Sequence, residues 1–385
     1  MGVDCPARRG DHAAGADMIV AKKIFELPEF HATGGRVIKN LRIGWECYGR
    51  LNADRSNAIL VAHYFSGTSH AAGRYAKDDV YPGYWDVLIG PGKAIDTDRY
   101  FVFSADTLVN LNARDPRVVT TGPATIDPDT GRPYGLSFPP VTIADFVAVQ
   151  KALVDHLGIR KLHAVIGPSM GGLQTLAWAA AYPGMMDRIM PVVCAGEIDA
   201  WLIAWLGLWG APIRADPAWK NGAYAIDAQP AAGLTLALKL ITLQANHGQW
   251  VDAQFGRAFA DEGAAPVDAL GNAYKVEAAI AAIAAERASI ADANHLLYLV
   301  KANQTFAAGP TGTLADLENV RAKTLFLYSS TDQVFRADKA RATAAAIAKG
   351  GAPVETAEIQ GPFGHANGLF AMAPLGDRIA DFLSR

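Results

Sequence analysis

A serine at position 169 has the surroundings of an enzymatic nucleophile. It lies in Gly167-Pro168-Ser169-Met170-Gly171, after a short apolar run (162–166) and before a helix-like segment of small and apolar residues. This is the G-x-S-x-G nucleophile elbow, a sharp turn from strand to helix in which side chains at the glycine positions would clash. A glycine-rich turn with a bystander serine is the alternative, but the strand and helix that the motif requires are both expected here. The pattern predicts a serine hydroxyl raised above a sheet, able to attack a carbonyl carbon.

Such a serine needs a base, and the base needs an acid to orient it. Enzymes with this elbow carry both later in the chain, the acid first and the histidine last. Asp332 follows an expected strand (324–328), and His365 lies in a glycine-flanked loop near the end of the chain. Taken alone, Asp332 could cap a helix, and a loop histidine is more often a satisfied polar residue. Their order after Ser169 favours a catalytic triad of Ser169, Asp332 and His365.

The negative oxygen that forms during such an attack needs two N–H donors. One is expected from Met170, directly after the serine, and the other from the loop after an early strand. That loop is 63–67, where Phe65 is the first choice and its two neighbours are the alternatives. His63 and His70 flank the loop, and we interpret both as structural because the base is already supplied.

The elements that must position these residues follow an α/β pattern. Strand-like runs alternate with helix-like runs, which predicts a mostly parallel sheet flanked by helices. The expected strands are 57–63, 100–104, 162–166, 190–194, 324–328 and 355–359, and the expected helices include 142–157, the segment after Ser169, and 374–383.

Between residues 197 and 317 the strand runs vanish and alanine-rich helical stretches such as 232–243 and 276–288 replace them. We interpret this segment as a helical cap inserted into the core. The longest apolar stretch, 200–213, is too short to span a bilayer, so it is expected to be a buried or pocket-lining helix. The predicted division is a loose leader at 1–18, a core at 19–196 and 318–385, and a cap at 197–317.

Composition excludes several classes of partner. The 385 residues carry a formal net charge of -3 without a long basic or acidic run, so nucleic acid and anionic membranes are not expected partners. The three cysteines, Cys5, Cys47 and Cys194, fit no zinc spacing and no disulfide framework. We therefore expect inert packing cysteines, a cytoplasmic location and no metal.

Longer fragments carry a resemblance to a known family. The chain resembles the homoserine O-acetyltransferase family of the α/β-hydrolase fold in HYFSGTSHAAG (63–73), WDVLIGPGKAIDT (85–97), PYGLSFPPVTIAD (133–145), the elbow with Gly172 and Gln174, ADPAWKNG (215–222) and the late Gly-His loop. The resemblance implies a two-step acyl transfer in which the serine takes an acyl group, commonly acetyl from acetyl-CoA, and passes it to a hydroxyl. It also implies that Ser169 is the nucleophile, His365 the base and Asp332 its orienting acid.

Three departures from the family concern the acceptor pocket. Members that acylate homoserine carry an arginine in a cap helix where this chain has Leu238, and their late loop usually reads Gly-His-Asp where Ala366 stands here. The cap also carries a stripe of Trp201, Trp205 and Trp209, which is either core packing or pocket lining. Since leucine cannot grip a carboxylate as arginine does, a zwitterionic acceptor loses its charged contacts. We therefore expect Leu238, Trp205 and Trp209 to contact an apolar substrate.

The first hypothesis is a serine esterase that hydrolyses small or apolar, acetate-type esters. The alternative is an acyl-CoA-dependent O-acyltransferase resembling homoserine O-acetyltransferase, in which acetyl-CoA would be a substrate and no cofactor is needed. A non-catalytic binding protein is a third hypothesis, and the complete Ser–Asp–His order argues against it. Members of the resembled family are often dimers, which implies a homodimer beside the small-molecule ester or acyl donor.

Overall fold

The computed structural model describes residues 18–225 and 227–385. Within them a large sheet has the strand order β1-β2-β6-β3-β7-β8-β9-β10. The pairs β1–β2 and β2–β6 are antiparallel, and every other neighbouring pair in this sheet is parallel. Its strands are β1 (Lys23–His31), β2 (Val37–Tyr48), β3 (Ala58–Val61), β6 (Phe101–Ala105), β7 (Leu162–Pro168), β8 (Met186–Val192), β9 (Lys323–Tyr328) and β10 (Val354–Glu358). A small sheet pairs β4 (Ile89–Gly90) with β5 (Ile95–Asp96).

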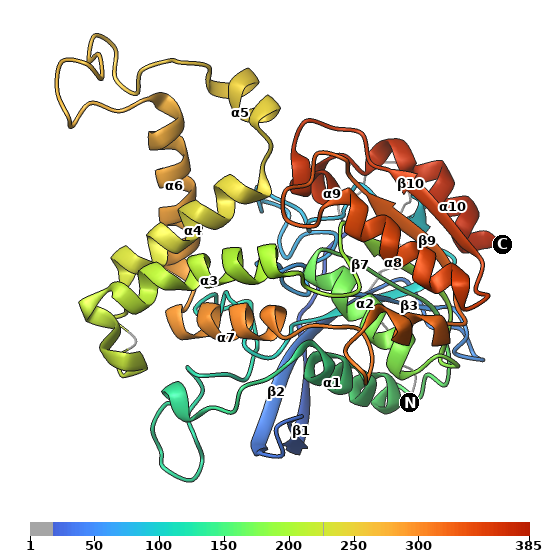
Figure 1. Cartoon of the computed structure of the whole chain (residues 1–385). Coiled ribbons are helices and arrows are strands. Elements are labelled where there is room, and N and C mark those ends of the chain that lie inside the picture. The colour runs from blue at the N-terminus through green and yellow to red at the C-terminus, as the bar shows by residue number, and fades with distance from the viewer. Residues whose placement is uncertain (1–17, 226) are drawn as a thin grey trace.

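Helices flank the sheet and also form a separate group beside it (Figure 1). The helices of the core are α1 (Ile143–His156), α2 (Met170–Ala181), α8 (Ala337–Lys349), α9 (Asn367–Phe370) and α10 (Gly376–Ser384). The separate group contains α3 (Ala200–Ala215), α4 (Ala231–Ala245), α5 (Gly248–Phe255), α6 (Lys275–Ile290) and α7 (Ala293–Gln304). Short 3-10 turns are η1 (Gly135–Ser137), η2 (Pro217–Gly222), η3 (Leu314–Asn319), η4 (Gly364–Ala366) and η5 (Ala373–Leu375).

The central strands are buried on both faces, as a parallel sheet between helices requires. In β3, Leu60 belongs to the hydrophobic core on one side, whereas Ile59 and Val61 belong to the core on the other side. Successive side chains of a strand point to opposite faces, so the continuous apolar run of β3 supplies both cores at once. The predicted α/β fold with a mostly parallel sheet is confirmed.

Helix α1 shows how local sequence fixes an element. Thr142 caps its start by accepting the N–H of Asp145, and the Asp145 carboxylate accepts the N–H of Thr142 at 2.7 Å. This reciprocal capping box satisfies N–H groups that a helix start leaves unpaired. Asp145 also accepts the N–H of Thr33 at 2.7 Å, which ties the helix to the connection between β1 and β2. The predicted helix at 142–157 is confirmed within one residue at each end.

The strands at one edge were not predicted from the sequence. Most residues of β1 are exposed or half-buried, and its polar positions give no continuous apolar run. Strand β8 was predicted at 190–194 but spans Met186–Val192, so that prediction is wrong by several residues at its start. It begins with polar positions such as Arg188, whose Nε donates to the Phe382 carbonyl.

The five helices α3–α7 lie between β8 and β9 in the chain, where a cap was expected. Helix α3 packs against α4 and α7, and α4 packs against α6. The apolar stretch 200–213 lies within α3. Among the described residues, no helix is long and apolar enough to cross a membrane. The exact domain boundaries stay predictions, and the leader expected at 1–18 lies outside the described residues except for Met18.

One prediction about the cysteines is wrong. Cys194 is a free, buried thiol, as expected for a packing residue. Cys47, in contrast, takes part in a disulfide. The cytoplasmic location, which we inferred partly from the cysteines, stays a prediction.

Candidate active site

Ser169 stands between β7 and α2, as the elbow motif requires. Its φ of 57° places a non-glycine residue in the left-handed region, a strained conformation that the surrounding structure must impose. The backbone N–H of Ser169 donates to the Val192 carbonyl of β8 at 2.8 Å, which holds the turn against the neighbouring strand. The strain is therefore maintained by the sheet beneath it.

The two glycines of the elbow are required by a close approach to another strand end. A Cβ added at Gly171 would lie 2.1 Å from the Ala62 carbonyl oxygen, and one added at Gly167 would lie 2.5 Å from the same atom. Ala62 directly follows β3, so backbone from two neighbouring strands meets at this point. Any larger residue at either position would push the elbow off the sheet.

His365 joins the other two predicted catalytic residues. Its Nε2 lies 2.8 Å from Ser169 Oγ, and its Nδ1 lies 2.8 Å from Asp332 Oδ2. Ser169 follows β7, Asp332 follows β9 and His365 lies in η4 after β10, so all three stand at the carboxyl ends of parallel strands. With Nδ1–H donating to the carboxylate, Nε2 is free to accept the serine proton.

Asp332 does not cap a helix. Helix α8 begins at Ala337, five residues later, with Arg336 in the capping position. The second carboxylate oxygen, Oδ1, accepts the N–H groups of Val334 and Phe335 at 2.7 and 2.9 Å. The loop thus fixes Oδ1, and Oδ2 faces His365. This arrangement favours the orienting acid over the helix cap as the interpretation of Asp332.

Comparison with known proteins agrees with this geometry. The family profile described as alpha/beta hydrolase fold matches residues 81–367. A curated relative, homoserine O-acetyltransferase of Methanococcoides burtonii, is 37% identical over 357 residues, which cover 92% of this chain and 72% of that protein. The chain belongs to the homoserine O-acetyltransferase family of the α/β-hydrolase fold. Because the named relatives are enzymes, this chain is an enzyme as well.

Two solved structures resemble this member of the family closely. Esterase E22 has a TM-score of 0.91 and 46% identity, with coverage of 95% of this chain and 100% of that chain. Homoserine O-acetyltransferase from Bacillus anthracis has a TM-score of 0.90 and 34% identity, with coverage of 96% and 98%. The family therefore includes proteins named for hydrolysis and proteins named for acyl transfer, and this chain is similar to both.

Two backbone N–H groups, those of Met170 and of Phe65 in the loop after β3, are the donors expected to stabilise the oxyanion. Met170 is the first residue of α2, so its N–H has no partner one turn earlier in the helix. Phe65 lies with Ser169 on the wall of one cavity, where its ring meets Trp209 edge-on at 5.4 Å. The assignment of Met170 and Phe65 as donors stays a prediction.

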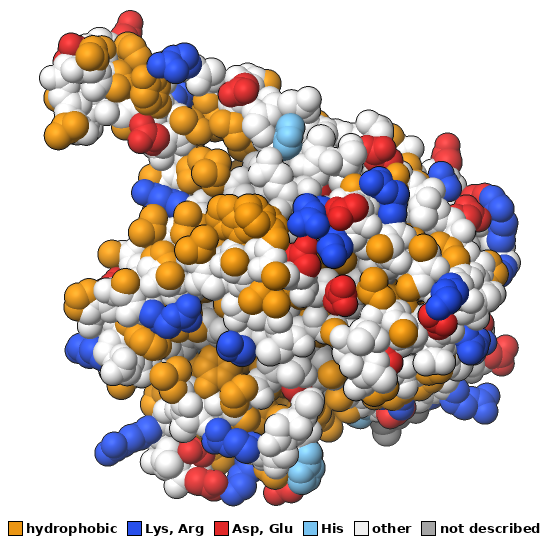
Figure 2. Space-filling view, in the orientation of Figure 1, with side chains coloured by type: hydrophobic (Ala, Val, Ile, Leu, Met, Phe, Trp, Pro, Cys, Tyr) orange, Lys and Arg blue, Asp and Glu red, His pale blue; other side chains and the backbone are white. Residues whose placement is uncertain are grey.

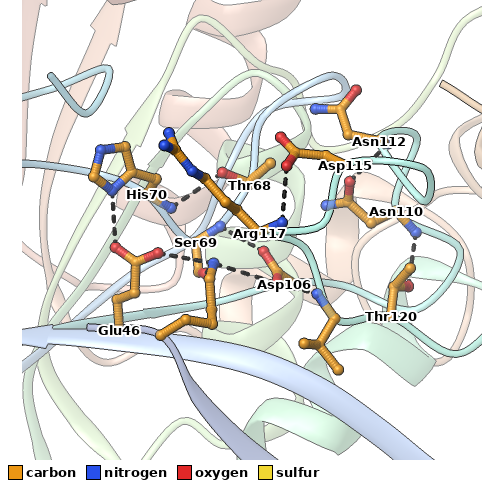
Figure 3. Close-up of polar contacts among 12 residues, drawn as sticks. Glu46, Thr68, Ser69, His70, Asp106, Asn110, Asn112, Asp115, Arg117 and Thr120 are labelled. Carbon is orange, nitrogen blue, oxygen red and sulfur yellow. Dashed lines mark hydrogen bonds and ion pairs between the residues drawn. The ribbon is translucent and has the colours of Figure 1, made fainter. Parts of the chain in front are cut away.

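Buried amides and His63 hold this loop from behind. His63 Nδ1 lies 2.8 Å from the Tyr64 carbonyl and Nε2 accepts the N–H of Thr107, while burial lowers the pKa of the ring and keeps it neutral. The side-chain amide of Asn110 donates to the Gly67 carbonyl at 3.0 Å. His63 thus has a structural role, as the sequence suggested. Figure 3 shows Asn110 and Asn112 beside this loop.

A second polar network fixes the far end of the same loop (Figure 3). Glu46 of β2 is fully buried, and its carboxylate contacts His70 Nδ1 at 3.0 Å and Lys22 Nζ at 2.8 Å. Tyr75 donates its hydroxyl to Glu46 at 2.6 Å, and Asp106 accepts the N–H of Ser69 at 2.7 Å. Sequence reasoning missed Glu46 and Asp106. A lone glutamate between Trp45 and Cys47 was the available signal, but β2 itself was not predicted.

Glu46 should make folding stability depend on pH below about 4.5. Burial alone would raise the pKa of this carboxyl, but the hydrogen bond from His70 and the charge of Lys22 outweigh it and lower the pKa from 4.5 to about 2. With a lowered folded-state pKa, the stabilisation is complete above the unfolded-state value and is lost as the pH falls towards 2. We expect Glu46→Gln to destabilise the protein by about 3 kcal/mol near neutral pH.

Urea unfolding of the native protein and of Glu46→Gln at a series of pH values measures this difference in stability. The gap should narrow as the pH falls below about 4.5, because protonation then removes the charge from the native protein too. A gap of constant size across that range would contradict the assigned cause.

Cys194 lies near the triad but does not compete with the serine. Burial, together with the nearby charge of Asp332, raises the pKa of its thiol well above the usual value. Only the thiolate is a good nucleophile, so the neutral thiol is inert. Among the described residues, no cluster of histidines, cysteines and carboxylates could hold a metal ion.

Two cavities adjoin the triad. The first, of about 20 Å³, touches Ser169 and is lined mainly by apolar side chains, with Asn303 the polar exception: Phe65, Ile198, Leu202, Leu206, Trp209, Val334 and Phe335. The second, of about 450 Å³, is more polar and touches Asp332: Trp201, Trp205, Gln244, Gln333 and Arg336 complete its lining. Trp209 therefore lines the first cavity and Trp205 the second, and the contact of both residues with substrate stays a prediction.

Leu238 has a different position from the two tryptophans. It is fully buried within α4 and lines neither of these cavities. The structure therefore places Leu238 on neither cavity, and its contact with substrate stays a prediction. Gln244, which the sequence did not single out, accepts the indole N–H of Trp209 at 2.8 Å and keeps its own Nε2 unpaired among the described residues.

Proposed function

We propose that the protein transfers acyl groups through a covalent acyl-serine. The observation that carries this proposal is His365, which lies 2.8 Å from both Ser169 Oγ and Asp332 Oδ2. His365 takes the hydroxyl proton as Ser169 attacks the ester carbonyl, and then gives that proton to the departing alcohol. Asp332 holds the imidazole in the required tautomer and stabilises its transient positive charge.

The developing oxyanion is stabilised by backbone N–H groups, for which we propose Met170 and Phe65. Donors fixed before the reaction need no reorganisation when the charge appears, and such stabilisation is often the largest catalytic contribution. The start of α2 adds the positive end of its helix dipole at the same place. In the second step His365 takes a proton from the acceptor as the acceptor attacks the acyl carbonyl. The acyl group then leaves with the acceptor, and His365 returns the proton to Ser169 Oγ.

Water is the acceptor that we favour, with small or apolar acetate-type esters as substrates. The cavity beside Ser169 is lined almost entirely by apolar side chains and contains no cationic or anionic group. Ala366 follows His365, so no carboxylate stands there to bind an ammonium group. The 46% identity with a protein named esterase E22 supports the same choice.

Acyl-CoA-dependent O-acyl transfer is the second candidate. The curated relatives that match over most of this chain are named homoserine O-acetyltransferase, at 34–37% identity. In that case acetyl-CoA would be a substrate rather than a cofactor, and an alcohol would replace water in the second step. Neither mechanism requires a metal or a bound cofactor.

Acceptor dependence separates these two functions. We expect the protein to release acetate from p-nitrophenyl acetate and ethyl acetate without any added alcohol, because water reaches the acyl-serine. A transferase would instead release free CoA from acetyl-CoA only when homoserine or another alcohol is present. Intact-protein mass spectrometry would show the acetyl-serine adduct in both cases. CoA release that depends strictly on the alcohol, with no ester hydrolysis, would overturn the esterase proposal.

We propose that the cap helices bind a second copy of this chain and so form a homodimer. Apolar side chains gather on the visible face over the cap helices (Figure 2). Exposed large apolar residues of α3, α4 and α6 are Trp201, Ile203, Leu208, Leu236, Leu243 and Ile283. Contiguous apolar surface on a protein often marks an interface. The cytoplasmic location also stays a proposal.

A further inference from the structure

Gln174 is a residue of the helix after the elbow that the proposed mechanism does not use. It lies in α2, five residues after Ser169, and its side chain is completely buried. The amide Nε2 donates to the His63 carbonyl at 3.1 Å and to the Met170 carbonyl at 3.2 Å. One side-chain amide thus joins two segments of backbone that lie far apart in the chain.

An indole and a second buried amide fix the orientation of the Gln174 side chain. The N–H of the Trp178 indole donates to Gln150 Oε1 at 2.8 Å, and Gln150 Nε2 donates to Gln174 Oε1 at 2.6 Å. An indole nitrogen can only donate, so it determines which end of the Gln150 amide is the oxygen, and Gln150 in turn determines the same for Gln174. All three side chains are buried, and the helices that carry them, α1 and α2, pack side by side (Figure 1). Gln174 therefore presents its NH₂ group, and not its oxygen, to the two carbonyls.

Both carbonyls lie beside the backbone N–H groups that we propose for the oxyanion. Met170 supplies one of these N–H groups, and the carbonyl to which Gln174 donates belongs to the same residue. Phe65, which supplies the other, stands two residues after His63 in the loop after β3. Strands β3 and β7 are parallel neighbours, so this loop and the elbow leave the sheet at the same edge. Gln174 thus hydrogen-bonds to both halves of the proposed oxyanion site.

The position of His63 sets the direction of the Phe65 N–H. This N–H shares a peptide group with the Tyr64 carbonyl, which lies 2.8 Å from His63 Nδ1 and accepts the N–H of Gly67 at 2.9 Å. Because a trans peptide is planar, its N–H points away from its carbonyl, so these two bonds orient the N–H. His63 also supplies the carbonyl to which Gln174 donates, and a shift of His63 would therefore turn the N–H of Phe65.

We propose that Gln174 is a positioning residue that keeps the N–H groups of Met170 and Phe65 at the spacing that one oxyanion requires. This inference rests on the proposed acyl transfer and adds a residue to its machinery. Donors stabilise an oxyanion best when they are fixed about 3 Å from its position before the reaction begins. Gln174 lines neither of the cavities beside the triad, so it acts through these backbone groups and not on the substrate. Without its amide, the loop after β3 and the elbow would lose a bond that joins them.

Gln174→Met tests the proposal, because methionine has a similar length and volume but cannot donate a hydrogen bond. We expect kcat for ethyl acetate hydrolysis to fall by about tenfold to a hundredfold, since small displacements of preorganised groups have effects of that size. KM should stay within about twofold of the native value, because the oxyanion forms only in the transition state. A merely structural role would lower the unfolding temperature without separating kcat from KM in this way. A native kcat in Gln174→Met, or a loss that lies wholly in KM, would overturn the proposal.

Thr175→Val is the matched control within the same helix. Thr175 is also completely buried, and its hydroxyl donates to the Gly171 carbonyl at 2.8 Å. The variant therefore loses a buried bond from side chain to backbone but none to the loop after β3, and it should keep a native kcat. An equal fall in kcat would overturn the assignment, because any bond lost in α2 would then have the effect.

Gln174→Asn takes the place of Gln174→Met if the methionine variant fails to fold. Asparagine keeps the amide but is one methylene too short to contact both carbonyls, so we expect the same fall in kcat with an unchanged KM. A native kcat in Gln174→Asn would overturn the proposal.

A transition-state analogue measures the same alignment without turnover. Ser169 Oγ forms a bond to the carbonyl carbon of 1,1,1-trifluoroacetone, the carbonyl oxygen receives the electron pair and becomes an oxyanion, and His365 keeps the serine proton. We expect the inhibition constant to rise about tenfold or more in Gln174→Met and to stay native in Thr175→Val. An unchanged constant in Gln174→Met would overturn the positioning role. Failure of the proposed acyl transfer itself would be seen as absent phosphonylation of Ser169 by a fluorophosphonate in the native protein, so the two failures are distinguishable.

Discussion

Ser169→Ala is expected to lower kcat for ester hydrolysis by about 10⁴-fold or more, because alanine has no atom that can form the acyl intermediate. The oxyanion donors and the substrate pocket would remain, so a small rate above that of water should persist. Substrate binding should change little, since the hydroxyl is a small part of the contact surface. Initial rates with p-nitrophenyl acetate and intact-protein mass after fluorophosphonate treatment measure the two effects.

Ser137→Ala is a suitable control, because Ser137 is an exposed serine in the short turn η1, far along the chain from the triad. It should react with the probe and hydrolyse the ester as the native protein does. Near-native hydrolysis by Ser169→Ala would show that another group is the nucleophile and that the proposed mechanism is wrong. Loss of activity with an unchanged unfolding temperature would exclude a folding defect as the cause.

The elbow could be predicted from sequence because its physical cause is local. Gly167 and Gly171 are needed wherever a strand turns directly into a helix beside another strand, and the backbone of Ala62 is what they avoid. The triad partners could be found by order alone, since parallel strands bring their carboxyl ends to one edge in any fold of this class. A residue's position directly after a parallel strand was therefore a better guide to the triad than its distance along the chain from Ser169.

The polar groups behind the site could not be predicted in this way. Glu46 contacts His70 and Lys22 only because β2 pairs antiparallel with β6, and the mixed sequence of β2 gave no periodic signal. Asp106 was equally hidden, because its bond to the N–H of Ser69 joins two separate segments of the chain. Both depend on contacts between segments far apart in the chain. Such contacts follow from tertiary packing, not from local pattern.

Asp332→Asn is expected to reduce kcat by about 10⁴-fold while leaving the fold intact, because it reverses the histidine tautomer. In the native protein, Oδ1 of Asp332 accepts the N–H groups of Val334 and Phe335, and Oδ2 faces His365. An asparagine would keep its oxygen towards those two N–H donors, since its amide nitrogen cannot accept a hydrogen bond. Its NH₂ group would then donate to Nδ1 of His365.

That exchange places the imidazole proton on Nε2, the atom 2.8 Å from Ser169 Oγ, where a proton acceptor is needed. The base is then present at the correct distance but in the wrong protonation state, so the rate falls although no contact is removed. Asp338→Asn, at an exposed acid paired with Arg336, is the matched control and should retain native rates. Steady-state kinetics together with thermal unfolding measure both proteins. If Asp332→Asn kept a rate within about tenfold of native, orientation by the carboxylate would not be what makes His365 a base.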